Sequence, residues 1–340
     1  MSRSAPEAIT LVVAAGKNPP DLSTLDGLDI RMATPEQLPS AIRGADALLI
    51  WDFSATGVAS ALQVQDRLKW IHVNSAGIDH VLTPELRRSG ITLTNTRGLL
   101  DEAIAEYVLG LVLAFAKDLP KTLQLQQKQQ WNHRLTGRLS GSKALVVGPG
   151  SVGRCVGEVL GKVGVAVDAV GRTPRHGDGT FGSVFAQHCL KDVIGNYGYV
   201  VLTAPLTPET EGMINAPVLD AMDSAARLIN VGRGPLIVED HLIAALNKGT
   251  IAGAAIDVFQ HEPLPPTHPL WTTPNTIISP HMAGDFFEWR AAALEIFVRN
   301  LRRFRSGTEL LNQIDKEAGY VRSSRSPSSV LQEQQKENAS

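Results

Sequence analysis

The chain has 340 residues, of which 43% are hydrophobic and 19% are charged, and its formal net charge at pH 7 is -2. This composition is that of a globular protein with enough residues for two domains, and without a basic excess a broad nucleic-acid-binding surface is excluded. Two cysteines, Cys155 and Cys189, are too few for a disulfide framework, which favours a reducing, cytoplasmic compartment. We expect no signal sequence in Met1–Pro6, and the most apolar stretch, Ile104–Ala116, is too short to cross a bilayer.

The N-terminal part of the chain alternates between short apolar runs and stretches that suit helices, which is typical of a small parallel α/β unit. The predicted strands are Ile9–Ala14, Ala47–Trp51, Trp70–Val73 and Ile91–Thr94. Between them, the helix-compatible stretches are Pro35–Arg43 and Thr56–Leu68. This part of the chain is long enough to form a domain of its own.

The clearest predicted helix is Leu100–Asp118, which begins with Asp101 and Glu102 at the positive end of its dipole and continues with a long apolar run. We expect this helix to carry the chain into a second domain. The Gln-rich segment Gln124–Gln130 that follows has two interpretations. It is either a polar linker, or a continued helix or arm that contacts a second copy of the chain.

The stretch Ala144–Gly153, ALVVGPGSVG, is the motif around which the second half of the chain is organised. Its apolar residues suit a buried strand and Arg154–Val163 suits a helix, so the glycines lie in a strand-turn-helix. Gly148 permits the tight turn, Gly150 lets a pyrophosphate approach the backbone, and Gly153 lets helix and strand pack closely. Because a helix N-terminus also offers N–H groups to phosphates, the motif predicts a dinucleotide site.

Alternation of strands and loops resumes after this motif. The predicted strands are Val165–Val170, Tyr199–Thr203, Arg227–Asn230, Gly253–Asp257 and Thr276–Ser279. Ligands of open α/β sheets bind at the carboxyl ends of strands, so we expect the chemistry in the loops that follow them. A helix over Asp285–Phe304 is expected to return to the first domain, and the polar segment Lys316–Ser340 is predicted to be a disordered tail.

Three of these strand-end loops supply one cation, one carboxylate and one imidazole. The loops are NVGRG at Asn230–Gly234, DVFQHEPLP at Asp257–Pro265 and SPHMAG at Ser279–Gly284. Reduction of a carbonyl group needs a cation for the substrate, a proton donor for the developing alkoxide and a source of hydride. Arg233 would bind the substrate and His281 would act as general acid. Glu262 would orient the imidazole and favour its protonated form.

Simpler interpretations of the same residues stay open. Arg233 alone is compatible with a surface turn, Glu262 with a solvated side chain, and His281 is one of nine histidines. Only the three together favour catalysis. A metal site formed by His261, Glu262 and His268 is disfavoured, because the Pro-rich spacing provides no helical face to hold two ligands together, and we expect no metal.

The order and context of these motifs resemble those of the D-isomer-specific 2-hydroxyacid dehydrogenases. The similarity runs from NSAGIDH at Asn74–His80 to LLNQID at Leu310–Asp315, and Thr94–Glu106 resembles the family's TNTxG…AE region. The resemblance implies an α/β fold with two domains, a Rossmann-type NAD(P)-binding domain over 101–285 inserted into a flavodoxin-like substrate domain over 1–100 and 286–315. It leaves 316–340 as a tail. It also implies a homodimer built on the cofactor domain.

The resemblance also assigns site residues. Ser75, Ala76 and Gly77 correspond to the segment that presents backbone N–H groups to the substrate carboxylate. The residues that would line the cofactor are Gly148, Gly150, Ser151, Val152, Gly153, Thr203, Ala204, Pro205, Val231, Gly232, Arg233, Asp257, His281, Ala283 and Gly284. Of these, Asp257 would lie near the nicotinamide amide. Trp51, at the end of a first-domain strand, would either wall the substrate pocket or be a half-buried core aromatic.

The end of the second strand of the cofactor domain predicts which nicotinamide is used. An NAD-selective fold usually ends this strand in Asp or Glu, which hydrogen-bonds to the ribose 2′-hydroxyl. Asp168 falls near the expected distance but lies inside the predicted strand. The strand-end position is Gly171, and it is followed by Arg172, Thr173 and Arg175. Because two guanidinium groups stand where a carboxylate would repel a phosphate, we predict that NADP(H) is preferred and NAD(H) is possible, unless these arginines only solvate a loop.

The family's substrates are small 2-oxo and 2-hydroxy acids, and the resemblance favours reduction of glyoxylate or hydroxypyruvate to the D-2-hydroxy acid. Asp285 departs from the small hydroxyl residue frequent after the family's His-x-Ala-Gly motif, which leaves the side-chain preference of the pocket open. Formate dehydrogenases place Gln where Glu262 stands, and the tail is too short for the regulatory domain of phosphoglycerate dehydrogenases. A nicotinamide-sensing corepressor of the same fold is the alternative from another class. No nucleic-acid or membrane partner is expected.

Overall fold

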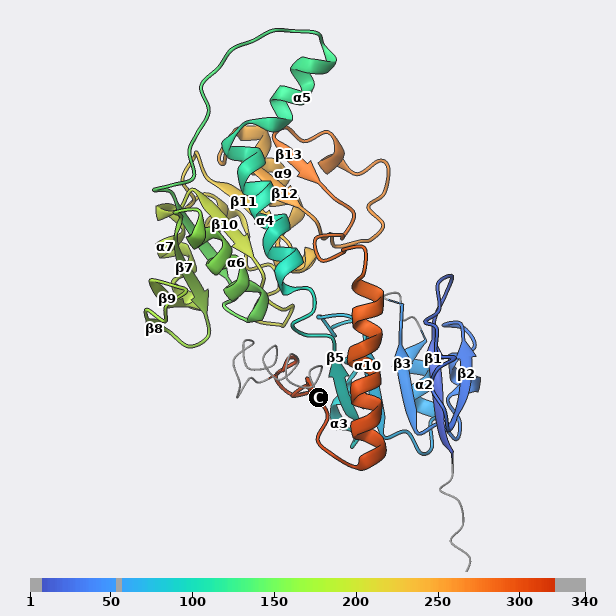
Figure 1. Ribbon diagram of the computed structural model, residues 1–340. Coiled ribbons are helices and arrows are strands. Elements are labelled where there is room, and N and C mark those ends of the chain that lie inside the picture. Colours follow the sequence, from blue (N-terminus) through green and yellow to red (C-terminus); the bar gives the residue numbers. More distant parts are fainter. Residues whose placement is uncertain (1–7, 53–56, 322–340) are drawn as a thin grey trace, which may run out of the picture. The chain divides into compact units, whose positions relative to one another are not determined.

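The computed structural model describes residues 8–52 and 57–321 (Figure 1). The chain folds into two compact units. Among the described residues, unit 1 combines 8–52 and 57–99 with 287–321, and unit 2 is the continuous segment 100–286. Unit 2 is therefore inserted into the sequence of unit 1.

Unit 1 is organised by a parallel sheet that has five strands in the described part of the chain, in the order β2-β1-β3-β4-β5. The strands are β1 Ile9–Ala14, β2 Leu28–Ala33, β3 Ala47–Ile50, β4 Trp70–Val73 and β5 Thr92–Asn95. Strands β3 and β4 are buried at every position, because side chains pack on both faces of the sheet. The order is that of flavodoxin-like folds, which confirms the fold predicted for this unit.

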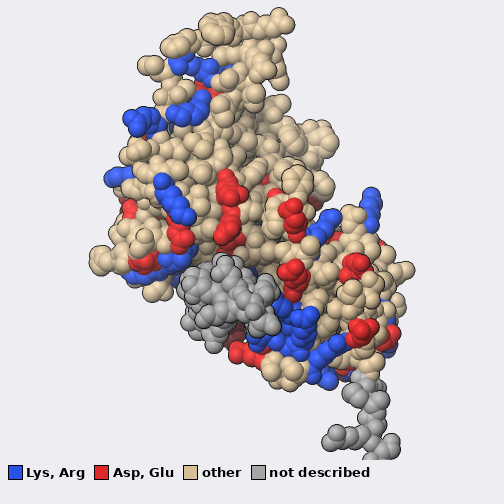
Figure 2. All heavy atoms as spheres, in the orientation of Figure 1, with Lys and Arg blue, Asp and Glu red and all other residues tan. Residues whose placement is uncertain are grey.

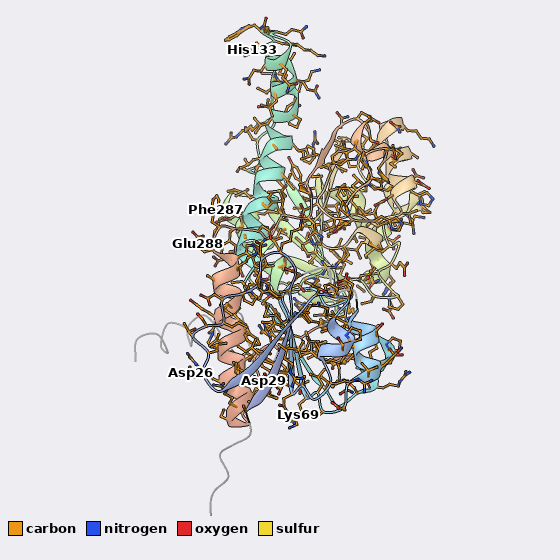
Figure 3. The ribbon with its side chains drawn as sticks, turned by 90° about the vertical axis from the view of Figure 1, so that its right-hand side faces the viewer. Asp26, Asp29, Lys69, His133, Phe287 and Glu288 are labelled. Carbon is orange, nitrogen blue, oxygen red and sulfur yellow. The ribbon has the colours of Figure 1, made fainter. Side chains whose placement is uncertain are left out.

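Helices cover both faces of the unit 1 sheet. The helices α1 Leu38–Ala41, α2 Val58–Val64 and α3 Pro84–Arg88 contribute to the core on one face. The long helix α10, Trp289–Ser306, contributes Phe297 and Leu301 to the core on the other face. The ring of Phe297 stacks on that of Trp70, with centroids 5.4 Å apart. Figure 3 shows Phe287 and Glu288 at the start of this helix.

Unit 2, every residue of which is described, contains an eight-stranded sheet in the order β13-β12-β11-β10-β6-β7-β9-β8. The strands are β6 Lys143–Val147, β7 Ala166–Gly171, β8 Arg175–His176, β9 Ser183–Ala186, β10 Tyr199–Leu202, β11 Arg227–Asn230, β12 Gly253–Ile256 and β13 Thr276–Ile278. All pair in parallel except β8, which is antiparallel to β9. The order from β9 to β12 is the Rossmann order 3-2-1-4-5-6, so the predicted fold class is confirmed.

Two layers of helices cover this sheet. One layer contains α4 Asp101–Ala116 and α6 Ser151–Lys162, and the other contains α7 Leu190–Val193, α8 Ala216–Leu219 and α9 Glu239–Lys248. Short 3₁₀ turns occur at η1 Gln187–Cys189, η2 Ile194–Asn196, η3 Gly234–Leu236 and η4 Pro269–Trp271. The carboxyl ends of β6 and β10 lie at the topological switch point of the sheet, where this fold binds its ligand.

The helix α5, Leu119–Gln127, and residues 128–138 form an arm that extends from unit 2 (Figure 1). Asp118 has a positive φ of 49°, which separates α5 from α4, and Arg134 pairs with the Asp118 carboxylate at 2.7 Å. The helical interpretation of the Gln-rich segment therefore holds up to Gln127. His133 lies at the far end of the arm (Figure 3), and next to it the Trp131 side chain is 100% exposed.

Most predicted strands occur within one residue of their expected bounds, but some elements differ. The strand β2 was not predicted, and as an edge strand it has only one fully buried residue, Ala33, among its six. The two helices predicted before β4 are shorter than expected, and α10 begins at Trp289 rather than at Asp285. The strands β8 and β9 were also not expected; β8 has only two residues and pairs with β9 alone.

Contacts of unit 1 continue past the predicted start of the tail at Lys316. The Lys316 ammonium donates to the carbonyl of Ile91 at 3.0 Å, and Arg97 donates to the carbonyl of Val321 at 3.2 Å. Residues 316–321 therefore belong to unit 1. The rest of the predicted tail, 322–340, lies outside the described residues.

Charged side chains of both signs are mixed over the visible face of unit 2 (Figure 2). The helix α10 carries basic residues in its last turn, where they complement the helix dipole.

Within residues 8–52 and 57–321, no helix has both the length and the apolar character needed to cross a membrane.

His72 of β4 is a titratable group in the core of unit 1. Its ring is fully buried, and its Nδ1 lies 2.8 Å from the Thr94 hydroxyl, which also accepts a hydrogen bond from the Trp70 indole at 2.9 Å. The Nε2 atom is buried without a partner among the described residues. Burial lowers the pKa of His72 to about 3, so the folded protein holds this ring neutral at pH 7.

We predict that His72 destabilises the protein progressively in acid. In an unfolded chain histidine has a pKa of about 6.5, so between about pH 6.5 and about pH 3 the unfolded state binds a proton that the folded state does not. As the pH is lowered through this range, the free energy of unfolding should decrease by up to about 1.4 kcal/mol per pH unit from this group alone. His72→Phe should flatten that slope in urea unfolding measured over a pH series. An unchanged slope, matching that of the exposed control His133→Phe, would contradict the assignment.

Candidate active site

The glycine-rich turn after β6, Gly148–Gly153, is shaped by contacts that only glycine allows. Gly148 has a φ of +106°, and a Cβ atom there would lie 2.5 Å from the Ala204 nitrogen. A Cβ atom at Gly153 would lie 2.1 Å from the Gly148 carbonyl oxygen. The Thr203 hydroxyl donates to that same carbonyl at 2.8 Å. The turn after β6 and the loop after β10 are therefore packed directly against each other.

This turn fits the phosphates of a dinucleotide. Gly150 is exposed, and a Cβ atom there would meet nothing within 4 Å, so the backbone is open to a ligand at this one position. The helix α6 begins at the next residue, and its first-turn N–H groups, including those of Val152 and Gly153, have no intrahelical acceptor. The positive end of the helix dipole and these donors suit an anion.

The end of β7 lacks a free carboxylate. As predicted, Asp168 lies inside the strand, where it accepts hydrogen bonds from the Ser183 N–H at 2.7 Å and the Tyr197 hydroxyl at 2.8 Å. Its role is therefore to hold the sheet together. Gly171 is the last residue of β7, and Arg172 and Thr173 after it are exposed.

Arg175, which the sequence analysis named as a cofactor-binding residue, is paired with Asp178. Its Nε and Nη2 atoms donate to Oδ2 of Asp178 at 3.1 and 2.8 Å, and Arg154 of α6 donates to the same oxygen at 2.9 Å. The hydrogen bond from Arg154, followed by that from Arg175, outweighs burial and holds the pKa of Asp178 far below its ordinary value. Asp178 thus fixes Arg175 in place by one edge of its guanidinium group. Nη1 of Arg175 makes no hydrogen bond within the described chain.

The loop after β11 presents Arg233. The Asn230 side chain accepts from the Gly232 N–H at 3.1 Å and donates to the Arg233 carbonyl at 2.9 Å, so one amide spans the loop. The guanidinium Nη1 donates to the Gly232 carbonyl at 2.7 Å. Asn230 is fully buried at the end of its strand, which makes it a rigid anchor for Arg233.

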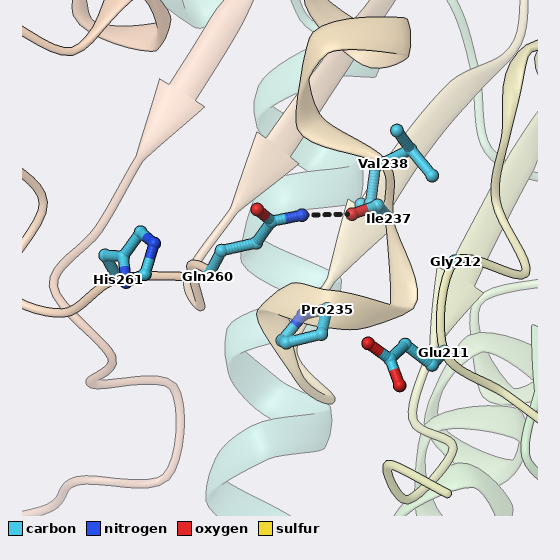
Figure 4. Close-up of a pocket in the computed structure, with 7 residues that line it drawn as sticks. All are labelled: Glu211, Gly212, Pro235, Ile237, Val238, Gln260 and His261. Carbon is cyan, nitrogen blue, oxygen red and sulfur yellow. Dashed lines mark hydrogen bonds between the residues drawn. The ribbon is translucent and has the colours of Figure 1, made fainter. Parts of the chain in front are cut away.

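Gly234 lets this loop meet the loop after β12. A Cβ atom at Gly234 would lie 2.0 Å from the Phe259 carbonyl carbon, so only glycine permits the two backbones to touch. Gln260 adds a hydrogen bond from its side-chain amide to the Ile237 carbonyl at 3.2 Å (Figure 4). The shallow cavity of about 270 Å³ in that view contains none of the predicted site residues. The contact brings the segments that carry Arg233 and Glu262 together.

Glu262 and His281 form a hydrogen-bonded pair. Oε2 of Glu262 lies 2.7 Å from Nδ1 of His281, Oε1 accepts from the Phe259 N–H at 2.9 Å, and each of the two paired side chains is 30% exposed. Burial raises the pKa of the Glu262 carboxyl, but the hydrogen bonds from His281 and Phe259 and the charges of His281 and Arg233 outweigh it. The pKa of Glu262 is therefore below its ordinary value. The three predicted catalytic side chains of unit 2 interact at one place.

Asp257 organises the loop that carries His281. Its buried carboxylate accepts from the Ser279 hydroxyl at 2.6 Å and from the N–H groups of Met282 and Ala283 at 3.0 and 2.9 Å. The His281 N–H donates to the Asp257 carbonyl at 2.8 Å. These bonds hold His281 at a φ of +53°, a region that residues other than glycine seldom adopt.

Tyr107 of α4 lies behind this loop and was missed by the sequence analysis. Burial raises the pKa of its hydroxyl, a hydrogen bond with Ser279 lowers it, and the charge of Asp257 raises it, with a net upward shift. Tyr107, Ser279 and Asp257 therefore form a connected polar group. Val231 and Ala283 of the predicted cofactor site are buried, Gly284 is half-buried against Leu100, and Pro205 is exposed.

The predicted substrate residues of unit 1 have different environments. The N–H groups of Ala76 and Gly77 donate to no acceptor within the described chain, and the Ser75 hydroxyl donates to the Gly77 carbonyl at 2.5 Å. The segment is held by Asn95, which donates to the Ala76 carbonyl at 2.6 Å. Trp51 is only 4% exposed and packs in the core of unit 1, and its indole donates to the backbone carbonyl of Asn18 at 2.9 Å. Trp51 is therefore a buried residue of this core, and its role in a substrate pocket stays a prediction.

Two of the residues considered for a metal site, Glu262 and His268, form contacts with other residues instead. His268 lies 3.3 Å from a Glu239 oxygen and accepts the Leu270 N–H, whereas Glu262 pairs with His281. No group of three potential ligands occurs in the described ranges.

Comparison with known proteins agrees with this architecture. Residues 109–283 match the family described as D-isomer specific 2-hydroxyacid dehydrogenase, NAD binding domain. A glyoxylate reductase from Thermofilum pendens is 34% identical over 293 residues, which span 84% of this chain and 86% of that protein.

Two solved structures are similar over 92% of this chain and 100% of theirs. One is a D-isomer specific 2-hydroxyacid dehydrogenase from Xanthobacter autotrophicus in complex with NADPH and MES, with 30% identity and a TM-score of 0.77. The other is an NADPH-dependent glyoxylate/hydroxypyruvate reductase from Sinorhizobium meliloti in complex with NADP and sulfate, with 25% identity and a TM-score of 0.80. The chain belongs to the D-isomer specific 2-hydroxyacid dehydrogenase family and is a nicotinamide-dependent oxidoreductase.

We predict that Gly234→Ala separates the Arg233 and Glu262 loops. The added Cβ atom overlaps backbone rather than a mobile side chain, so the free energy of unfolding should fall by about 1–3 kcal/mol and turnover should fall with it. Gly161→Ala in α6 is the matched control, because its Cβ atom meets nothing within 4 Å. That variant should be neutral or more stable by up to about 1 kcal/mol. Equal stability of the two variants in urea unfolding would refute the close contact.

Proposed function

We propose that the enzyme reduces a small 2-oxo acid of the glyoxylate or hydroxypyruvate kind to the D-2-hydroxy acid, with NADPH as the preferred reductant. The observation that supports this most directly is the Glu262–His281 pair at 2.7 Å, with the Arg233 charge acting on the same carboxylate. Relatives named as glyoxylate reductases support the substrate class. The bound reduced nicotinamide would supply the hydride, held by the turn after β6 and the loop after β10.

The catalytic residues of unit 2 have distinct roles in this proposal. The His281 imidazole donates a proton to the substrate carbonyl oxygen as hydride reaches the carbon, and because Nδ1 bonds to Glu262, the proton leaves from Nε2. Glu262 remains a carboxylate, orients the ring and stabilises its protonated form. Arg233 binds the substrate carboxylate and polarises the carbonyl group. Asp257 is a positioning residue, because its carboxylate holds the loop of His281.

The residues proposed for the substrate in unit 1 are the backbone N–H groups of Ala76 and Gly77. Two adjacent donors that bond to no acceptor among the described residues suit a carboxylate group. Ser75 supports them, since its hydroxyl is bonded within the same turn.

The preference for NADPH rests on the end of β7. A ribose 2′-hydroxyl acceptor is missing at Gly171, while Arg172 is exposed and Arg175 has one unused edge. Similar structures were solved with NADPH or NADP, which supports the same choice. NAD(H) would bind more weakly.

We further propose that the enzyme is a homodimer whose subunits meet through the arm of unit 2. Leu123, Trp131 and Leu135 of the arm are 59%, 100% and 93% exposed. Apolar side chains exposed to this degree favour a protein contact. Sedimentation of the purified protein would report the dimer.

The cytoplasm is the proposed compartment. Cys155 and Cys189 are free thiols. Burial first, then the charges of Asp101 and Glu102, raise the pKa of Cys155 to about 11, which keeps it unreactive as a thiol.

A substrate panel tests the proposed function. The protein should oxidise NADPH fastest with glyoxylate or hydroxypyruvate and more slowly with pyruvate and bulkier 2-oxo acids, as followed by absorbance of the reduced cofactor. His281→Ala should lower kcat by about 10²- to 10⁴-fold, since it removes the general acid. Arg233→Ala should chiefly raise KM for the acid. His268→Gln is the control, because His268 contacts Glu239 instead. Absence of turnover with every acid would favour the corepressor-like interpretation.

The cofactor preference is tested by removing one cation. Arg172→Ala should raise the Kd of NADPH by about tenfold or more, because one charge-assisted hydrogen bond to phosphate is lost, and should leave NADH binding nearly unchanged. Arg302→Ala on α10 removes an exposed charge from unit 1 and serves as the control. Tighter binding of NADH than NADPH by the unmodified protein would refute the preference.

A further inference from the structure

The ring of Pro149 occupies the space beside Gly171. A Cβ atom added at Gly171 would lie 2.7 Å from Cγ and 2.8 Å from Cδ of Pro149, closer than real Cβ contacts allow. On its other side the nearest atom is Cγ1 of Val184 at 3.6 Å, which is ordinary contact. The φ of Gly171 lies outside the left-handed region, so the backbone itself would accept another residue. The obstacle to a side chain at position 171 is the proline ring.

The proline ring has little freedom to move away. The preceding Gly148 donates its N–H to the Val170 carbonyl at 2.9 Å, which ties the turn to β7 directly before Gly171. The same glycine is packed against the loop after β10, with a positive φ that fixes the path of the chain. The pyrrolidine ring also has no long side-chain rotamer to change. A side chain at position 171 would therefore displace the phosphate-binding turn.

Position 171 is where this fold selects its cofactor. It is the last residue of β7, the strand next to β6, and a carboxylate there would hydrogen-bond to an NAD ribose and repel a 2′-phosphate. We propose that Pro149 is a specificity-determining residue, because its ring keeps any acidic side chain out of this position and so preserves the preference for NADPH. This inference rests on the proposed cofactor preference. It assigns that preference to a contact between two segments as well as to the arginines.

The inference predicts that Gly171→Asp favours NADH binding only when the ring of Pro149 is also removed. Gly171→Asp alone should weaken binding of both NADPH and NADH by about tenfold or more, because the turn is displaced. Pro149→Ala with Gly171→Asp removes Cγ and Cδ from the overlap, so NADH binding should recover and the preference should reverse. Kd values are measured by fluorescence of the reduced nicotinamide without any 2-oxo acid, and each double variant is compared with Pro149→Ala alone.

A second pair of variants separates steric overlap from charge. Gly171→Ala should weaken both cofactors alike and lower the free energy of unfolding, and Pro149→Ala should restore both properties. The inference is overturned if Gly171→Asp alone binds NADH as tightly as the double variant, or if the unfolding free energies of Pro149→Ala and Gly171→Ala add without coupling. If the unmodified protein prefers NADH, the proposed cofactor preference fails, and the unfolding cycle still tests the overlap without any cofactor.

Discussion

The buried carboxylate of Asp257 is the constraint on which the active-site geometry depends. Both of its oxygens accept hydrogen bonds from the loop of His281. This loop holds His281 at a positive φ, which is energetically unfavourable for residues other than glycine. The hydrogen bonds of Asp257 together offset this unfavourable backbone energy on one short segment. Because the same strand end leads on to Glu262, a single stretch of chain orients both the imidazole and its partner. The proposed catalytic residues therefore lie on loops whose conformation is determined by hydrogen bonds to a residue at the end of a strand.

Much of the fold was predictable because the strands are buried on both faces and read as continuous apolar runs. The strands β1, β4 and β11 have the predicted bounds, and the glycine motif identified the first strand and helix of the cofactor fold. The edge strand β2 escaped prediction because Asp29 and Arg31 interrupt its apolar residues, and only Ala33 of its six residues is fully buried. The short strand β8 depends on pairing with β9, which local sequence does not reveal.

The candidate site was predictable in its residue types and less so in their contacts. Motif order identified Arg233, Glu262 and His281, because each follows a strand at the same edge of the sheet. Pairing of Arg175 with Asp178 was not evident, since it depends on how a short hairpin folds back. The contact between Pro149 and Gly171 joins the turn after β6 to the end of β7, and no local pattern predicts which glycine faces which ring. Trp51 was ambiguous because a tryptophan at a strand end suits a core and a pocket equally.

The division of unit 1 between the two ends of the sequence has a consequence for biosynthesis. A ribosome makes the five-stranded sheet first, but α10, which covers the face containing Trp70, emerges only after the whole of unit 2 has been synthesised. The face of the nascent sheet that contains Trp70 is therefore uncovered until α10 has been synthesised. Unit 2 is continuous in sequence and completes its own core as it emerges. Chaperone protection during translation would matter most for the first-made segment of the chain.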